Sequence, residues 1–186
     1  MKLSNLKEIT IVEVVQGPNQ QIGLKDPSLL NNLRDTGRNI EGYNLFALQI
    51  NDEIVFALKQ GEMILTVLVG TLITNFPNDQ LKTIRVGRSW TPEEFRNKGF
   101  STALYDGLPR NGYRVVSDEQ LSDAAISVWK KLGTKRKLKA FDWETGQYTD
   151  KDPLTNPRVS FILEFTGYTH KSTILKESVL FTAVNN

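Results

Sequence analysis

The sequence places two cations and a glycine directly ahead of a short apolar run. The order at residues 96–102 is Arg96, Asn97, Lys98, Gly99, Phe100, Ser101 and Thr102. If a helix begins at Phe100, its first N–H groups have no intrahelical partner, and its dipole favours an anion there. The glycine lets the backbone approach a phosphate closely, and the cations and hydroxyls add donors. The spacing alone fits two interpretations, a phosphate-binding turn or a solvated basic loop before an ordinary amphipathic helix.

Most other site chemistries are excluded by residue counts. The chain has no cysteine and a single histidine, His170. Disulfides, thiolate nucleophiles and zinc–thiolate sites are therefore ruled out, and a histidine metal site or a serine–histidine triad lacks its partners. The four carboxylates at residues 142–152 do not follow the spacing of a calcium loop, so we predict no metal site. What remains is chemistry by backbone amides, carboxylates, hydroxyls and cations.

Length and charge bound the class of protein. With 186 residues, of which 39% are hydrophobic and 24% charged, we predict that residues 1–186 form a single domain. Lys and Arg (23) nearly balance Asp and Glu (21), so global charge gives no reason to expect nucleic acid or an anionic membrane as the main partner. No apolar run reaches the roughly 20 residues needed to cross a bilayer, and the first residues lack the apolar core of a secretory signal. We therefore expect a cytoplasmic protein.

Strand patterns recur along most of the chain. They are rich in β-branched residues and are bounded by Gly, Asn or Asp. Their ranges are residues 8–15, 43–50, 53–60, 62–73, 81–90, 112–117, 137–143, 158–165 and 174–183. Residues 144–157 are predicted to form a turn-rich loop.

Helix patterns occur at three places. One begins near Ser28 and ends at Gly37, and another follows the two cations. The third, over residues 118–133, has apolar residues at offsets of four, three and four, with Ser117 and Gln120 as a capping box.

The order of these elements predicts the fold class. Strands come first, and strands then alternate with helices, which indicates a twisted mixed central sheet with flanking helices in the α+β (mixed α/β) class. The strand–helix–strand order over residues 81–117 is most simply a crossover between parallel neighbours. The helix that follows the cations would then begin at the carboxyl edge of the sheet, where an anion binds best.

The same stretch resembles the signature of a known family. Residues 96–101 are similar to the Gln/Arg-x-x-Gly-x-Gly/Ala signature of the GNAT superfamily of N-acetyltransferases. Residues 91–99 and the later helix at residues 122–133 also resemble motifs of that family. The resemblance is specific over residues 81–133, and it implies the GNAT-like fold. More faintly, residues 112–132 are similar to GNAT-like proteins of bacteriophages, which points to a bacterial or phage-infected cell.

The resemblance implies an acyl-CoA-dependent N-acyltransferase that moves acetyl directly from acetyl-CoA, its co-substrate, to a primary amine. In the family, the signature loop binds the pyrophosphate, and the end of the preceding strand lies along the pantetheine arm. Carried over by position, the pyrophosphate cradle consists of Arg96, Asn97, Lys98, Gly99, Phe100 and Ser101. The strand contributes Gly87, Arg88, Ser89 and Trp90.

The later helix departs from the pattern of the family. Ser122 stands where the family often has asparagine, and Trp129 stands where it often has the tyrosine that protonates the departing thiolate. An indole N–H has no usable acidity, so Trp129 at most orients the thioester, and core packing is the competing interpretation. Ser101 replaces the last glycine or alanine of the signature but keeps its N–H.

Carboxylates that could accept the amine proton lie outside the strand at residues 81–90, which has none. Asp118 is the first candidate and Glu94 the second. The simpler interpretation is that Asp118 caps a helix and that Glu94 is a solvated loop residue. Tyr105 and Tyr113 are candidate acids by chemistry only.

A different class of function stays open. The departures at positions 122 and 129, and the cations within residues 130–139, also fit an inactive GNAT-like module that binds a protein or nucleic acid. The same cations fit two other interpretations. They offset the negative end of a helix, or they contact the 3′-phosphate of CoA. The predicted partners are a CoA thioester and an amine-bearing acceptor, a small molecule or a protein, with no membrane. We expect the acceptor site near residues 22–43.

Overall fold

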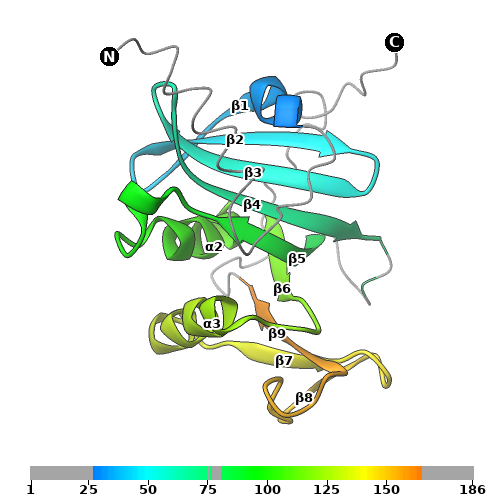
Figure 1. The fold of residues 1–186 in the computed structure, drawn as a ribbon. Coiled ribbons are helices and arrows are strands. Elements are labelled where there is room, and N and C mark those ends of the chain that lie inside the picture. The colour runs from blue at the N-terminus through cyan, green and yellow to red at the C-terminus, as the bar shows by residue number, and fades with distance from the viewer. Residues whose placement is uncertain (1–26, 75, 77–80, 165–186) are drawn as a thin grey trace.

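The computed structural model describes residues 27–74, 76 and 81–164, and these residues form a nine-stranded sheet (Figure 1). The strand order is β1-β2-β3-β4-β5-β6-β9-β7-β8. β5 and β6 are parallel, while the other neighbours are antiparallel. A mixed sheet with helices packed on it confirms the predicted α+β class.

The first half of the sheet is an antiparallel meander. Its strands are β1 (Arg34–Ile40), β2 (Tyr43–Ile50), β3 (Glu53–Gln60) and β4 (Met63–Ile73). The bounds of β2 and β3 agree with the prediction, and β4 begins one residue later than predicted. Asn51 and Gly61 have positive φ angles of 55° and 58°, which tight connections between antiparallel strands require.

The second half alternates strands with helices. Its elements are β5 (Lys82–Trp90), η2 (Glu93–Phe95), α2 (Phe100–Arg110), β6 (Tyr113–Ser117), α3 (Asp123–Lys135), β7 (Lys139–Asp142), β8 (Gln147–Thr149) and β9 (Val159–Leu163). The parallel pairing of β5 with β6 across α2 confirms the predicted crossover. β9 returns to lie between β6 and β7.

The predicted helix from Ser28 to Gly37 is wrong. A short 3₁₀ helix, η1 (Pro27–Asn32), gives way at Arg34 to the edge strand β1. Gly37, with a φ of 68°, lies at an irregularity in the pairing of β1 with β2. The sequence of β1 is polar, and pairing with the β2 edge overrides its weak intrinsic preference for strand.

The predicted start of the third helix is also wrong. Ser117 ends β6, and its Oγ accepts a hydrogen bond of 2.9 Å from the backbone N–H of Phe161 in β9. The cap of α3 is Ser122, whose Oγ accepts from the N–H of Ala125. The predicted end at Gly133 is wrong as well, since α3 continues to Lys135.

One further difference concerns the edge of the sheet. The predicted loop at residues 144–157 contains β8, which pairs with β7 at the sheet edge. The strands predicted at residues 8–15 and 174–183 lie outside the residues that the structure describes, and a single domain over residues 1–186 stays a prediction.

Both faces of the sheet are packed. Successive residues of β3 alternate between two hydrophobic clusters, with Phe56 in the larger and Val55 in the smaller. The larger cluster includes α2 and α3 through side chains such as Leu104 and Trp129. The smaller one gathers around Trp90 on the opposite face. None of the helices in residues 27–74 and 81–164 is long and apolar enough to cross a membrane.

An ion pair fastens α2 to the end of α3. Arg136 donates from Nε to Oδ1 of Asp106 at 2.6 Å and from its terminal nitrogen to Oδ2 at 3.0 Å. Arg110 donates to the same carboxylate at 3.1 Å. The hydrogen bonds from Arg136 hold the pKa of Asp106 below its ordinary value of 3.8.

This pair predicts a pH dependence of stability. A carboxylate with a depressed folded-state pKa stabilises the protein above its unfolded-state pKa, and that contribution disappears as the pH falls through the folded value. We expect Asp106→Asn to lower the urea midpoint near neutral pH and to have little effect in acid. The exposed Asp150→Asn is the control and is expected to leave the midpoint unchanged at both pH values. Equal losses for Asp106→Asn in acid and at neutral pH would contradict the electrostatic origin.

Candidate functional site

β5 and β6 separate at the carboxyl end of their pairing. Their parallel register ends at Val86 with Ser117, while β5 runs on to Trp90 along β4. In the part of the chain that the structure describes, no strand pairs with this edge of β5 beyond Val86. Four residues of backbone, 87–90, therefore face the gap between the two strands.

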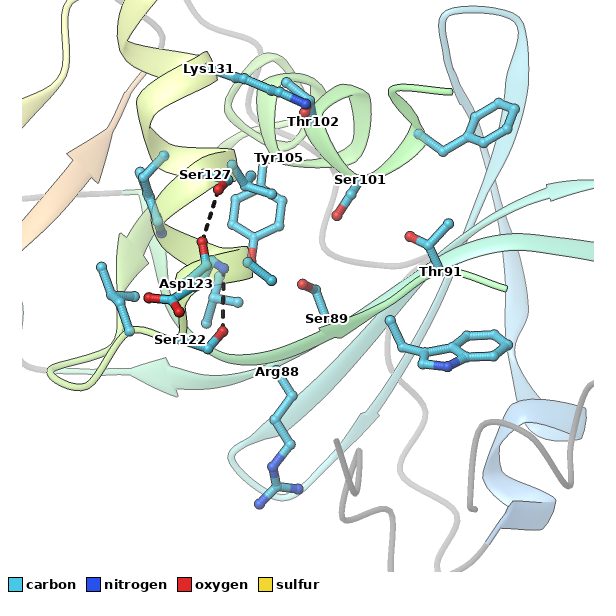
Figure 2. Close-up of a pocket in the computed structure, with 18 of the residues that line it drawn as sticks. Arg88, Ser89, Thr91, Ser101, Thr102, Tyr105, Ser122, Asp123, Ser127 and Lys131 are labelled. Carbon is cyan, nitrogen blue, oxygen red and sulfur yellow. Dashed lines mark hydrogen bonds between the residues drawn. The ribbon is translucent and has the colours of Figure 1, made fainter. Parts of the chain in front are cut away.

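A β-bulge lies at this same point. The register joins Gly70 to Val86 and then Val69 to Arg88, so Gly87 is skipped. A bulge leaves one residue outside the ladder and changes the face on which the following side chains lie. Val86 lies in the core on the helix side, while Trp90 lies in the cluster on the opposite face. Figure 2 shows the consequence, with Ser89 directed toward the helices and Arg88 directed away from them.

The loop before α2 holds two residues in the left-handed conformation. Asn97 has a φ of 62°, and Gly99, the N-cap of α2, has a φ of 87°. No side chain caps α2, so the first N–H groups of this helix have no partner from a capping residue. Nε of Arg96 donates to the carbonyl oxygen of Thr91 at 3.3 Å, which ties the loop to the end of β5.

A cleft of about 1110 Å³ joins these two features. Its walls are the end of β5, the start of α2, and the first part of α3 with the loop before it (Figure 2). Of the residues predicted to bind the co-substrate, those that line it are Gly87, Arg88, Ser89, Trp90, Arg96, Asn97, Gly99, Phe100 and Ser101. Lys98 is not among the lining residues, and its Nζ lies 5.5 Å from the centre of the Phe95 ring.

Of the two predicted carboxylates, only one lines the cleft. Asp118, just after β6, is half-buried and lines the cleft, and its Oδ1 accepts a hydrogen bond of 2.9 Å from the N–H of Glu119. Glu94 is exposed in η2 and is not a lining residue. Asp123, the first residue of α3, adds a second carboxylate to the lining. The cleft therefore carries cations such as Arg96 near the start of α2 and carboxylates near the start of α3.

Trp129 is a core residue that also reaches the wall of the cleft. Its side chain is 1% exposed, stacks on Phe161 with centroids 5.6 Å apart, and meets the edge of Tyr105 at 5.7 Å. These contacts are what the packing interpretation requires.

Tyr105 lines the cleft, although the sequence indicates it as a candidate acid by chemistry only. The spacing of Ser101 and Tyr105, one helical turn, places both on one face of α2, and both line the cleft. Burial raises the pKa of Tyr105 to about 12, against a smaller opposing effect of a hydrogen bond with Ser89. Tyr113, the other candidate acid, is buried in the core and does not line the cleft. The helical spacing was a usable signal for Tyr105, but the orientation of Ser89 depends on the bulge.

Comparisons with known proteins give little beyond the geometry. No family model matches the chain, and no curated protein matches it. Among solved structures, the ribosomal-protein-S18-alanine N-acetyltransferase from Escherichia coli aligns with a TM-score of 0.35 and 12% identity, covering 67% of this chain and 77% of that one. A protein of unknown function from Aquifex aeolicus aligns with a TM-score of 0.35 and 16% identity, covering 78% and 83%. Similarity this low does not place the chain in a family, so function has to be argued from the residues of the cleft.

Proposed function

We propose that this protein transfers an acyl group from a CoA thioester, most simply acetyl-CoA, to the nitrogen of an amine. One observation carries the proposal: the uncapped start of α2, the Arg96 side chain and the unpaired end of β5 all border the same cleft. A diphosphate with a long amide-bearing arm has the chemistry to use all three.

The start of α2 suits the pyrophosphate. Left-handed residues such as Asn97 and Gly99 turn backbone N–H groups toward an anion, and the dipole of α2 adds to the attraction. Arg96 supplies charge, and Ser101 supplies a hydroxyl in the first turn. Lys98 lies outside the lining of the cleft. We therefore assign it only long-range attraction of the phosphates.

The end of β5 suits the pantetheine arm. The edge at residues 87–90 presents backbone groups that no neighbouring strand of the described sheet uses. An extended chain with amide groups binds such an edge as an added strand does. The thioester would then lie near the bulge at Gly87, the residue that the pairing of β4 with β5 skips, and a backbone N–H at this bulge would polarise its carbonyl.

Aminolysis also needs a neutral amine held against the carbonyl and a route for one proton. Asp118 is the carboxylate to which we assign the amine proton, because it lines the cleft at the end opposite the cations. We assign Trp129 to packing, and Glu94, exposed outside the lining, receives no step.

The proposal is tested by thermal unfolding with acetyl-CoA. A ligand at about 100 times its dissociation constant stabilises the folded state by about 2.7 kcal/mol, a shift of roughly 5 to 10 °C for a chain of this size. We expect Arg96→Glu to weaken binding about tenfold, since it replaces an attractive charge with a repulsive one at the phosphates. The matched control is Arg34→Glu, an exposed charge reversal on the edge strand β1, which should leave the upshift intact.

Release of CoA thiol with a panel of small amines and peptides then separates an enzyme from a binding module. No upshift with wild-type protein, or the same upshift in Arg96→Glu, would contradict the proposed cradle. Binding of acetyl-CoA with no amine-stimulated thiol release would favour a module that only senses the thioester.

A further inference from the structure

Two threonine hydroxyls meet where β5 leaves the sheet. The pairing of β4 with β5 ends at Val67 with Trp90, so Thr66 and Thr91 come just beyond the last pair. Oγ1 of Thr66 donates to the carbonyl oxygen of Trp90 at 3.0 Å and lies 2.9 Å from Oγ1 of Thr91. Thr66 is buried and does not line the cleft, whereas Thr91 does. Side-chain hydrogen bonds therefore continue the contact between the two strands where the ladder stops.

The direction of these hydrogen bonds follows from the protons that are available. A threonine hydroxyl has a single proton, and a carbonyl oxygen can only accept. The proton of Thr66 goes to the carbonyl oxygen of Trp90, so the bond between the two hydroxyls uses the proton of Thr91. Both protons are then engaged, which holds the side chain of Thr91 in one rotamer. Thr91 presents only lone pairs to the cleft, so its hydroxyl does not itself bind a phosphate.

The carbonyl oxygen of the same Thr91 holds the side chain of Arg96. Nε of Arg96 donates to it at 3.3 Å. This bond uses the inner nitrogen of the guanidinium and leaves the terminal nitrogens for a ligand. The backbone N–H of Arg96 also donates to the carbonyl oxygen of Glu93 at 3.1 Å, which keeps the loop compact. Figure 2 shows Thr91 on the β5 side of the cleft, facing Ser101 of α2. A displacement of Thr91 is therefore passed on to the guanidinium.

We propose that Thr66 is a positioning residue for Arg96 and that, through Thr91, it holds the guanidinium at the phosphates of the CoA thioester without touching the ligand. This inference rests on the proposed function. Without the Thr66 hydroxyl, the carbonyl oxygen of Trp90 and the hydroxyl of Thr91 lose a buried partner, and the end of β5 shifts to find others. An arginine that is already held in place loses less side-chain entropy when it binds an anion, so the hydroxyl pair raises the affinity.

The test is the affinity for CoA, measured by calorimetric titration at low and at high salt. Thr66→Val keeps the shape of the side chain and removes the hydroxyl. We expect it to weaken binding about fivefold, the size of one net hydrogen bond. The affinity should also become less sensitive to salt, because a cation that is no longer held at the phosphates attracts them less. Thr66→Ser restores the hydroxyl and should recover most of both properties.

The matched control is a second buried threonine of the same region. Thr83, near the start of β5, accepts a hydrogen bond of 3.1 Å from Arg114 through its hydroxyl, and it lies outside the cleft. Thr83→Val removes a comparable buried bond between a threonine and an arginine. It should lower the melting temperature and leave both the CoA affinity and its salt dependence unchanged. A general loosening of the sheet would instead lower the affinity in both valine variants.

A double-mutant cycle shows whether Thr66 acts through Arg96. Thr66→Val should weaken CoA binding in the wild-type background and should have no further effect in the Arg96→Ala background. An unchanged affinity in Thr66→Val, an equal loss in Thr83→Val, or the same loss in the Arg96→Ala background overturns the inference while leaving the proposed function standing. Failure of the wild-type protein to bind CoA overturns both. If Thr66→Val does not fold, Thr91→Val removes the same bond from the loop side, and an unchanged affinity or an additive loss with Arg96→Ala overturns the inference.

Discussion

Gly99→Ala is expected to abolish useful binding of acetyl-CoA while leaving the protein folded. Gly99 has a φ of 87°, a conformation that costs a residue with a side chain about 1–2 kcal/mol. A Cβ at this position meets no protein atom within 4 Å, so the protein itself leaves the space open. The proposed cradle fills that space with phosphate oxygens, and a methyl group there displaces them from the N–H groups of α2. We expect affinity for CoA to fall about 30-fold or more, the loss of about 2 kcal/mol.

A second glycine serves as a control that separates backbone strain from the loss of contacts with the ligand. Gly61, in the turn between β3 and β4, also has a positive φ and open space where a Cβ would lie, and it lies outside the cleft. Gly61→Ala should lower the melting temperature as Gly99→Ala does but should leave CoA affinity at the wild-type value. Calorimetric titration of both variants below their melting temperatures measures the difference. Equal affinities for the two variants would show that Gly99 serves only to turn the chain.

The strands around the cleft were predictable because their sequences and their burial agree. β3 is buried along five consecutive residues, and its apolar run is bounded by Asn51 and Gly61, both with positive φ. β5, α2 and β6 follow one another along the chain, and a strand, a helix and a strand in this order are most simply joined as a parallel crossover. The loop before α2 was predictable too, because Gly99 and the apolar residues after it define a helix start.

The features that shape the cleft were less accessible to sequence reasoning. The bulge at Gly87 depends on the register between β4 and β5, which no local pattern specifies. The predicted start of α3 is wrong because Ser117 and Ser122 are both acceptable caps, and only the pairing of β6 with β9 commits Ser117 to the sheet. The sequence does not predict β1, because its residues are polar and pair on one side alone. In each case a contact far away in the chain decides between local alternatives.

The starts of α2 and α3 differ in how their first N–H groups are satisfied. Ser122 satisfies the first turn of α3 with its own hydroxyl, so that end has little capacity left for an anion. α2 begins at Gly99, which has no side chain to offer, so its N–H groups stay available to a ligand. Asp118 and Asp123 line the cleft near α3. Under the proposed function, the phosphates therefore bind at α2 and the amine at α3.

Trp129→Ala is expected to cost the protein about 3–5 kcal/mol of its free energy of unfolding. The indole is 1% exposed, and its contacts join three elements, through Tyr105 of α2 and Phe161 of β9. Removing it leaves a cavity that these rings cannot close, since each is held by its own strand or helix. A loss of this size is a large fraction of the stability of a typical domain, about 5–15 kcal/mol. Urea denaturation followed by circular dichroism measures it.

Two comparisons separate packing from chemistry at this position. Lys130→Ala changes the next residue of α3, which is exposed, and should alter stability by less than about 0.5 kcal/mol. Trp129→Phe keeps an aromatic ring against Tyr105 and should lose less stability than the alanine variant while binding CoA normally. If Trp129→Phe were fully stable yet bound CoA markedly more weakly than the wild-type protein, the indole itself would have to contact the ligand. We expect no such loss, because the indole is packed in the core against Tyr105 and Phe161 and has no acidic proton to give to a thiolate.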